Sequence, residues 1–421
     1  DTWLNEALGQ WSDMNITDTA EPTWRIRDNR IGLAMSAMRA DETLSTRAIR
    51  QPVITRDGIA ASFDNQIVYA KGATMFRMFE SFVGRDAWRT FLRGYLGAHA
   101  WGNASAEDFL HDLAQSFGPP IAAAMRTFLE QPGVPLVTAQ VHCEANQSPR
   151  LELAQQRSLP AGVIDPAPKQ WSFPVCMRYG DAKDSFRQCT SLKPPSTTIE
   201  LVGEFSGKLA GELGGGPTGA RLEPWHGCPT WFILNGDATS YYRSTVDPEI
   251  ARALLTPSSA IARAAKPAPA ERMMLVEDLR AAVARDELPL DKLLELVSLI
   301  AADPDDKVAR RAIGAATLPV SGLDDVMYRA AKRWYHKTFQ ARAKQLGWRR
   351  GAKDSEELHE LRQELDTLVA SDDPALTAEA ARLVERWLAD RSGIAADLVR
   401  PALAVAAHHG DAARFARYLA A

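Results

Sequence analysis

The spacing of hydrophobic residues changes twice along the chain and divides it into three regions. In residues 1–133 apolar side chains recur every three or four positions, as expected of helices that bury one face. Two such stretches are Met75, Phe76, Phe79, Phe82 and Val83, and Trp88, Phe91, Leu92, Tyr95 and Leu96. Ser105, with Asp108 three positions later, predicts a capping box at the start of a further helix. The first region is therefore expected to be helical.

Residues 134–247 alternate between apolar and polar side chains, which is the period of β-strands. Strands are expected over residues 135–141, 171–176, 197–202 and 230–234, separated by Pro, Gly, Asp and Asn. Six or seven short strands in a region of this length predict a small β-sandwich.

Residues 248–421 return to helical spacing, in short pieces divided by polar breaks such as residues 302–306. Apolar stripes predict helices over residues 273–283, 288–299, 326–346, 358–368, 376–388 and 394–406. Stacked helix pairs of the solenoid kind are the natural packing for such pieces. The expected fold class is an α+β multidomain protein, with domains at residues 1–133, 134–247 and 248–421.

Length and composition are those of a globular protein with two to four domains. The chain has 421 residues, of which 46% are hydrophobic and 24% charged, and its formal net charge is -4. The sequence has no basic face that would neutralise phosphates, so nucleic acid is not an expected partner. An apolar run of about 18 residues, enough to cross a membrane, is also missing from the sequence.

Both ends of the chain have features of cut ends. The segment from Asp1 to Glu6 has neither the basic start nor the apolar stretch of a signal peptide, and it begins within a predicted helix. The last predicted helix ends at Ala421 without a Gly, a Pro or a polar tail. The chain is therefore expected to be a piece of a longer protein, and the C-terminal domain to be incomplete.

All four cysteines lie in or near the β-rich region, which favours disulfides and an exported, periplasmic or extracellular protein. Cys176 and Cys189 flank a turn-like stretch, so a hairpin would bring them face to face and leave Cys143 and Cys228 as the second pair. Structural zinc and four reduced thiols in a cytoplasmic protein are the alternatives.

The glycine-rich segment Gly214–Gly219 has no Lys-Ser or Lys-Thr of a phosphate-binding loop. It is expected to be a flexible loop between strands.

The opening block Trp3-Leu4-Asn5-Glu6 resembles the W-L-N-E-G-F-A block of the aminopeptidase N-type zinc peptidases, also called gluzincins. In that family this glutamate is the third zinc ligand, and an H-E-x-x-H helix eighteen residues upstream supplies two histidines. The resemblance therefore implies that Glu6 binds Zn²⁺ and that the two histidines fall before Asp1. A carboxylate beside two imidazoles leaves one coordination position for water.

A second block makes the resemblance more specific. Residues 63–78, from Phe63-Asp64 through Tyr69-Ala70-Lys71-Gly72-Ala73, resemble the family's F-D-x-I-x-Y-x-K-G-A signature. The resemblance implies that Tyr69 donates its phenol proton to the oxyanion of the tetrahedral intermediate. Further similar blocks follow in family order at residues 41–49, 103–109, 131–137, 235–243 and 271–278.

By this resemblance the whole protein is a zinc aminopeptidase that hydrolyses N-terminal amino acids from peptides. Its fold would be the helical end of a thermolysin-like catalytic domain, a β-sandwich and a helical C-terminal domain. The expected partners are peptide substrates and the upstream part of the same polypeptide, and the fragment alone is expected to be inactive. One alternative is a non-catalytic homologue that binds peptides or acts as a scaffold. Another is an epoxide-opening relative, which the expected β-sandwich argues against.

Overall fold

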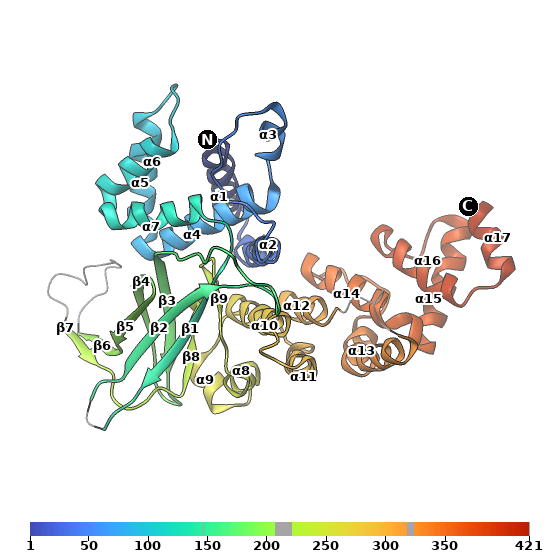
Figure 1. The fold of residues 1–421 in the computed structure, drawn as a ribbon. Helices are drawn as coiled ribbons and strands as arrows, with labels where there is room; N and C mark the ends of the chain where they lie inside the picture. The colour runs from blue at the N-terminus through green and yellow to red at the C-terminus, as the bar shows by residue number, and fades with distance from the viewer. Residues whose placement is uncertain (146, 207–220, 318–323, 421) are drawn as a thin grey trace. The chain divides into compact units, whose positions relative to one another are not determined.

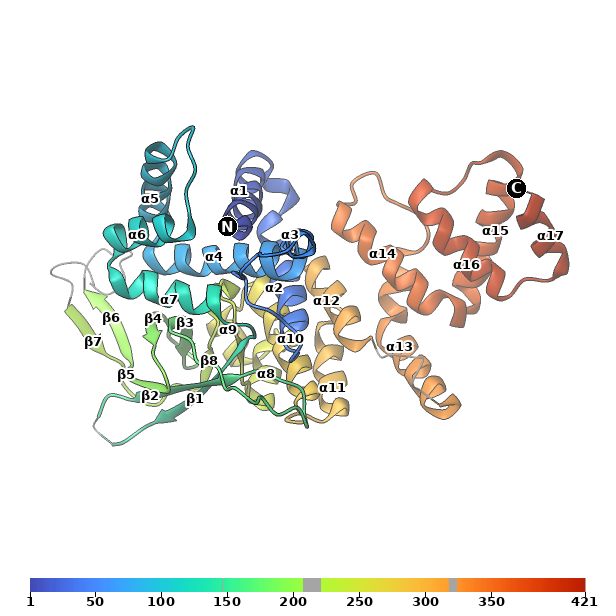
Figure 2. The same ribbon diagram turned by 45° about the horizontal axis from the view of Figure 1, so that its top comes forward.

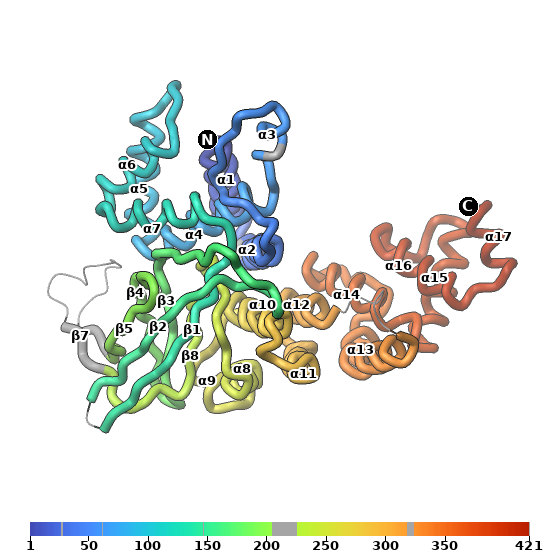
Figure 3. The backbone as a smooth tube through the Cα atoms, in the orientation of Figure 1, coloured from blue at the N-terminus to red at the C-terminus, as the bar shows by residue number. Residues whose placement is uncertain are grey.

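The computed structural model describes residues 1–145, 147–206, 221–317 and 324–420. They form two compact units, residues 1–290 and 291–421, and Figure 3 follows the backbone through each of them. A division into two compact units does not test the three expected domains at residues 1–133, 134–247 and 248–421, which stay a prediction. The glycine-rich segment Gly214–Gly219 lies outside the described residues.

Helices make up the first part of the first unit, as the apolar spacing predicted. They are α1 (Thr2–Ala20), η1 (Pro22–Trp24), α2 (Ile26–Asp41), α3 (Arg56–Ala61), η2 (Asn65–Lys71), α4 (Gly72–Val83), α5 (Arg85–Ala98), α6 (Ala106–Phe117) and α7 (Pro119–Glu130). The capping box at the start of α6 is confirmed: the Asp108 amide donates to Ser105 Oγ at 3.2 Å, and the Ser105 amide donates to Asp108 Oδ2 at 2.8 Å. Rings of Trp3, Phe76 and Phe109 pack together in the core of these helices.

The strands of the middle region form small sheets. They are β1 (Pro135–His142), β2 (Arg150–Arg157), β3 (Phe173–Gly180), β4 (Ser185–Leu192), β5 (Ser196–Glu200), β6 (Val202–Ser206), β7 (Arg221–Pro224), β8 (Trp231–Ile233) and β9 (Arg243–Ser244). The strand orders are β5-β2-β1-β9, β4-β3-β8 and β6-β7, with β1 and β9 parallel and the other neighbours antiparallel. Figures 1 and 2 show α4 and α7 lying between the sheets and the helices α1, α5 and α6.

Three helices complete the first unit after the strands. They are α8 (Pro248–Leu255), α9 (Ala260–Ala265) and α10 (Pro269–Ala284). Trp231 of β8 is fully buried against Leu254 and Ala265, which joins these helices to the sheets through a shared apolar core. The first unit therefore contains the helical region, the sheets and the start of the later helices in one packed body.

The second unit is helical. Its elements are α11 (Leu290–Ile300), α12 (Asp306–Ala316), α13 (Asp325–Leu346), α14 (Glu356–Val369), η5 (Ala370–Asp372), α15 (Pro374–Asp390), η6 (Ala396–Leu398), α16 (Val399–His408) and α17 (Ala412–Ala420). Consecutive helices pack in pairs, α13 with α14 and α15 with α16, which agrees with the expected stacking. The helix expected from Ile394 begins at Val399 instead, because Pro401 is tolerated only in the first turn of a helix. The α+β multidomain class is confirmed.

Candidate active site

Glu6 lies on α1 at the edge of the buried face of that helix. Trp3, Leu4, Ala7 and Trp11 are buried, whereas Glu6 is half-buried. Trp11 Nε1 donates a hydrogen bond to Glu80 Oε2 at 3.0 Å, which ties α1 to α4. The packing of α1 therefore fixes the helix and leaves the Glu6 carboxylate accessible.

Tyr69 lies on η2, a π-helical turn. Asp64 begins this turn: its Oδ1 accepts hydrogen bonds from the amides of Gln66 and Ile67, at 2.8 and 2.9 Å. Its carbonyl accepts from the amide of Tyr69, five residues on, at 3.3 Å. A π-helical turn shifts the following side chains around the helix axis, and such turns are frequent at functional sites.

A glycine lets the two elements approach each other. A Cβ added at Gly72 would lie 2.5 Å from the Cβ of Ala7, which is far shorter than a van der Waals contact. Since Gly72 follows η2 directly and Ala7 follows Glu6, this close approach sets the two candidate side chains beside each other. Any larger residue at position 72 would push α1 away from η2.

The structure brings Glu6 and Tyr69 together, although they lie 63 positions apart in the sequence. A hydrogen bond with the Glu6 carboxylate is the largest cause of a pKa of Tyr69 above its ordinary value of 10.0, and burial and the negative charge of Glu6 add to it. All three effects favour the protonated phenol. At neutral pH, therefore, Tyr69 is a hydrogen-bond donor that faces a carboxylate.

The residues of this chain can supply part of a zinc site but not all of its ligands. A carboxylate oxygen is an ordinary zinc ligand, and Glu6 is accessible enough to serve as one. Among the described residues, however, no group of three or more His, Cys, Asp or Glu side chains could hold a metal ion. Glu6 can thus supply one ligand, and the other ligands must come from elsewhere.

The cysteines form two disulfides, Cys143–Cys228 and Cys176–Cys189. Cys176 and Cys189 are directly opposite each other in the β3–β4 hairpin. All four cysteines are paired with one another, so the structure favours disulfides over zinc ligation or free thiols. The bonded sulfurs have no free thiolate to offer to a metal.

Lys71 and Asp41 lie next to the candidate site but were not among the predicted site residues. Both belong to segments that resemble the family, residues 63–78 and 41–49. Lys71, two positions after Tyr69, is fully buried, and its Nζ lies 2.8 Å from Oδ2 of the equally buried Asp41. Sequence spacing alone could not pair them, because the contact links η2 with the last residue of α2. A lysine inside an otherwise apolar helical stretch was the one available signal.

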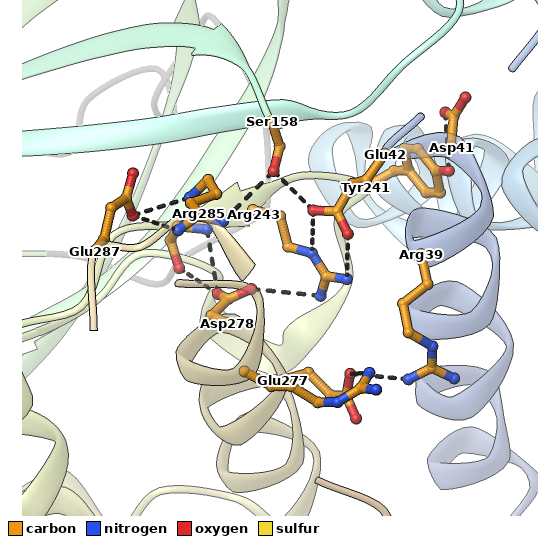
Figure 4. A network of polar contacts seen from close by, with 12 residues as sticks. Arg39, Asp41, Glu42, Ser158, Tyr241, Arg243, Glu277, Asp278, Arg285 and Glu287 are labelled. Carbon is orange, nitrogen blue, oxygen red and sulfur yellow. Dashed lines mark hydrogen bonds and ion pairs between the residues drawn. The ribbon is translucent and has the colours of Figure 1, made fainter. Parts of the chain in front are cut away.

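A second buried network lies beside this pair and joins α2, β9 and α10 (Figure 4). The guanidinium of Arg243 donates to both carboxylate oxygens of Glu42, at 3.0 and 3.2 Å. Glu42 also accepts from Ser158 Oγ at 2.7 Å, and Ser244 Oγ donates to Asp278 at 2.5 Å. Burial raises the pKa of Asp278 to about 6, and the nearby charge of Arg243 opposes that shift. These contacts hold the helical, β and later helical parts of the unit together.

A cleft of about 1070 Å³ lies between α1 and α5. Trp11, Ile16, Arg85, Arg89 and Arg93 are among the residues that line it, and Glu6 and Tyr69 are not. The candidate zinc ligand and phenol are therefore not part of this cleft.

The comparisons with known proteins agree with the resemblance drawn from the sequence. A family model described as the peptidase family M1 domain matches residues 1–128, and one described as the ERAP1-like C-terminal domain matches residues 231–421. Among curated relatives, aminopeptidase M1 of Arabidopsis thaliana is 28% identical over 93% of this chain and 42% of its own length. Aminopeptidase 2 of Candida albicans is 23% identical over 98% of the chain and 42% of its length. Aminopeptidase N of Lactobacillus helveticus is 32% identical over 43% of the chain and 21% of its length. The chain thus spans less than half the length of these relatives.

Proposed function

Because this chain belongs to the aminopeptidase N type of peptidase family M1, we propose that it forms the later part of a zinc aminopeptidase that removes N-terminal residues from peptides. One observation carries the proposal: the carboxylate of Glu6 and the phenol of Tyr69 meet across two elements that are far apart in the sequence. A zinc ligand and an oxyanion donor must lie side by side in such an enzyme.

In this proposal Glu6 contributes one carboxylate ligand, and histidines from the upstream part of the same polypeptide contribute the others. Bound there, zinc supplies Lewis-acid polarisation and lowers the pKa of a water molecule towards neutrality. The isolated chain is expected to be inactive, since one carboxylate cannot hold the ion against water.

Tyr69 has the second role. When water attacks the scissile carbonyl, negative charge develops on the carbonyl oxygen, and a pre-positioned phenol can donate a hydrogen bond to it. A phenol with the ordinary pKa of a tyrosine is already protonated at neutral pH, so it can act as this donor. The contact with Glu6 raises the pKa of Tyr69 further above its ordinary value.

The two disulfides support placing the protein in an oxidising compartment. We propose that it is exported, either to a periplasm or out of the cell. The helices of the described residues include none that is long and apolar enough to cross a membrane.

The test is hydrolysis of aminoacyl-arylamides by the full-length, zinc-loaded protein. Tyr69→Phe is expected to lower kcat by about 10²–10³, the usual loss for one oxyanion donor. Zinc content should stay the same. Tyr95→Phe is the matched control, because Tyr95 is another tyrosine of the helical region and its side chain packs among aromatic rings of the core. A normal rate for Tyr69→Phe would refute the role of the phenol.

Glu6→Gln tests the metal ligand separately. This variant is expected to lose zinc from the full-length protein while remaining folded, because Glu6 is only half-buried. Full zinc occupancy in the variant would contradict the proposal.

A further inference from the structure

We propose that the buried pair Lys71–Asp41 positions Tyr69 for the reaction, acting through the π-helical turn η2. This inference rests on the proposed function, since it assigns a role in the same site. Neither residue touches the reacting atoms, so both are positioning residues rather than catalytic ones.

Lys71 has a complete set of partners. Its Nζ donates to Asp41 Oδ2 at 2.8 Å and to the carbonyls of Gln131 and Gly133 at 3.3 and 3.2 Å. An ammonium group has three N–H donors, and these three acceptors use all of them. The side chain is therefore fixed in one place at the end of α7.

Asp41 is fixed just as firmly from its own side. Its Oδ1 accepts from the hydroxyl of Thr46 at 2.6 Å and from the amide of Gly133 at 2.9 Å. Its Oδ2 accepts from the hydroxyl of Tyr241 at 3.1 Å in addition to Lys71. The carboxylate thus connects α2, the exit of α7 and the segment before β9.

Gly133 is required at the centre of this arrangement. Its φ of +103° lies in a region that favours glycine, and a Cβ added there would lie 2.5 Å from Arg157 Nε. In this conformation its amide points to Asp41 while its carbonyl accepts from Lys71. The backbone is thus shaped to receive both members of the pair.

The geometry links this anchor to the phenol. Lys71 is the last residue of η2, Tyr69 lies two residues before it, and Asp64 fixes the other end of the turn through its capping hydrogen bonds. The seven residues of this π-helical turn lie between these two fixed ends. Holding both ends therefore determines where Tyr69 points relative to Glu6.

Stability alone is a weak reason for such a pair. Removing two charges from water is costly, and apolar replacements of buried ion pairs are often neutral or stabilising. Burial lowers the pKa of Lys71, because it disfavours the charged ammonium, and the charge of Asp41 opposes that change. The attraction between the two charges therefore has to offset the cost of removing them from water. A positioning role explains why charged groups occupy a fully buried location next to the site.

The experiment uses the full-length, zinc-loaded enzyme. The double variant Asp41→Asn with Lys71→Met removes both charges, leaves no unpaired ion and keeps an acceptor for the Gly133 amide. It is expected to keep its zinc and its KM within about threefold, while kcat falls roughly 10²-fold, the usual cost of misplacing a catalytic group by about 1 Å. The amides of residues 65–71 should exchange hydrogen faster than in the wild type.

A combined variant separates positioning from general damage. In a Tyr69→Phe background the same double change should lower kcat little further, because Lys71 and Asp41 act through the phenol. The matched control is Arg178→Met with Glu271→Gln, which neutralises another ion pair of the same unit, formed by Arg178 Nη1 and the buried Glu271 at 2.6 Å. It should leave kcat close to normal.

If the double variant does not fold, Tyr241→Phe replaces it. This change deletes a single hydroxyl that donates to Asp41, and kcat is expected to fall about threefold or more, because one hydrogen bond to the anchor is lost.

A normal kcat in the folded double variant, or in Tyr241→Phe where that variant is used, overturns the inference. So does an equal loss in the Arg178–Glu271 control, or a full additional loss in the Tyr69→Phe background. If Tyr69→Phe itself is normal, the proposed function fails first and the inference falls with it.

Discussion

The half-buried pair Glu6–Tyr69 and the buried anchor around Asp41 and Lys71 lie within one helical region but differ in burial and in hydrogen bonding. Glu6 and Tyr69 are half-buried. Asp41 and Lys71 are completely buried and have hydrogen bonds from several elements. Under the proposed function, the residues proposed to act in the reaction and the residues proposed to position them are therefore separate sets.

Their electrostatics differ in the same direction. A half-exposed carboxylate keeps much of its hydration, so removing it changes stability little. A buried charge has lost its water and depends on its partner, so removing one partner leaves a costly unpaired ion. Substitutions can therefore distinguish the two sets by what they change, either the rate or the free energy of unfolding.

The largest expected effect on stability comes from the buried network of Figure 4. Arg243→Met removes the partner of Glu42 and weakens the environment of Asp278, both of which have little exposure to water. We expect a loss of about 3–5 kcal/mol in the free energy of unfolding of the first unit. Urea denaturation followed by tryptophan fluorescence measures it, and a loss below 1 kcal/mol would show that the network is not structural.

A buried carboxylate in the second unit sharpens the comparison, because it lacks the partners that Asp41 has. Within the described part of the chain neither oxygen of Asp366 accepts a hydrogen bond, and burial raises the pKa of Asp366 to about 8, opposed in part by the charge of Arg362. The folded carboxyl thus keeps its proton up to about pH 8, whereas the unfolded one loses it near pH 3.8. Stability therefore falls as the pH rises through this window.

Asp366→Asn should remove that dependence. The variant is expected to be more stable than the wild type, with an advantage that grows between pH 5 and pH 8 by on the order of 4 kcal/mol. Thermal unfolding at the two pH values measures the difference. Equal effects of the substitution at pH 5 and pH 8 would contradict the assignment.

Gly72→Ala tests the close approach that brings Glu6 to Tyr69. The added methyl would meet Ala7 at 2.5 Å, so we expect a loss of about 1–3 kcal/mol from overpacking. The matched control is Gly94→Ala on α5, where a Cβ meets nothing within 4 Å and should stabilise the helix by about 0.5–1 kcal/mol. Similar melting temperatures for both variants would show that the helices can separate without cost.

The smallest expected effect belongs to the proposed zinc ligand. Glu6→Gln in the metal-free chain should change the free energy of unfolding by less than about 0.5 kcal/mol, since the residue is half-buried and outside the core. Urea denaturation measures this free energy, and the Arg243→Met variant, unfolded under the same conditions, serves as the reference for a large loss. A large loss would place Glu6 among the structural residues instead.

Much of the fold could be predicted because it follows from local patterns. The helical spacing of Met75, Phe76 and Phe79 and the capping box at Ser105 are properties of neighbouring residues, and the structure confirms both. The β3–β4 hairpin also follows from its turn, and it sets Cys176 opposite Cys189. Helices and hairpins can be predicted in this way because their hydrogen bonds join residues that are close in the sequence.

The parts that escaped prediction depend on distant contacts or on unusual backbone geometry. Residues 65–71 have an ordinary helical pattern, and nothing in it signals a π-helical turn. The partners of Lys71 come from residues 30 to 62 positions away, so no spacing rule could supply them. The pairing of Glu6 with Tyr69 was expected only from the family resemblance.

The most direct test of the central claim is the location of zinc in crystals of the full-length protein, found by anomalous scattering at the zinc edge. We expect one strong peak about 2.0–2.2 Å from a carboxylate oxygen of Glu6, with the Tyr69 hydroxyl facing the same cavity. A zinc peak elsewhere, with Glu6 bound only to protein groups, would contradict it.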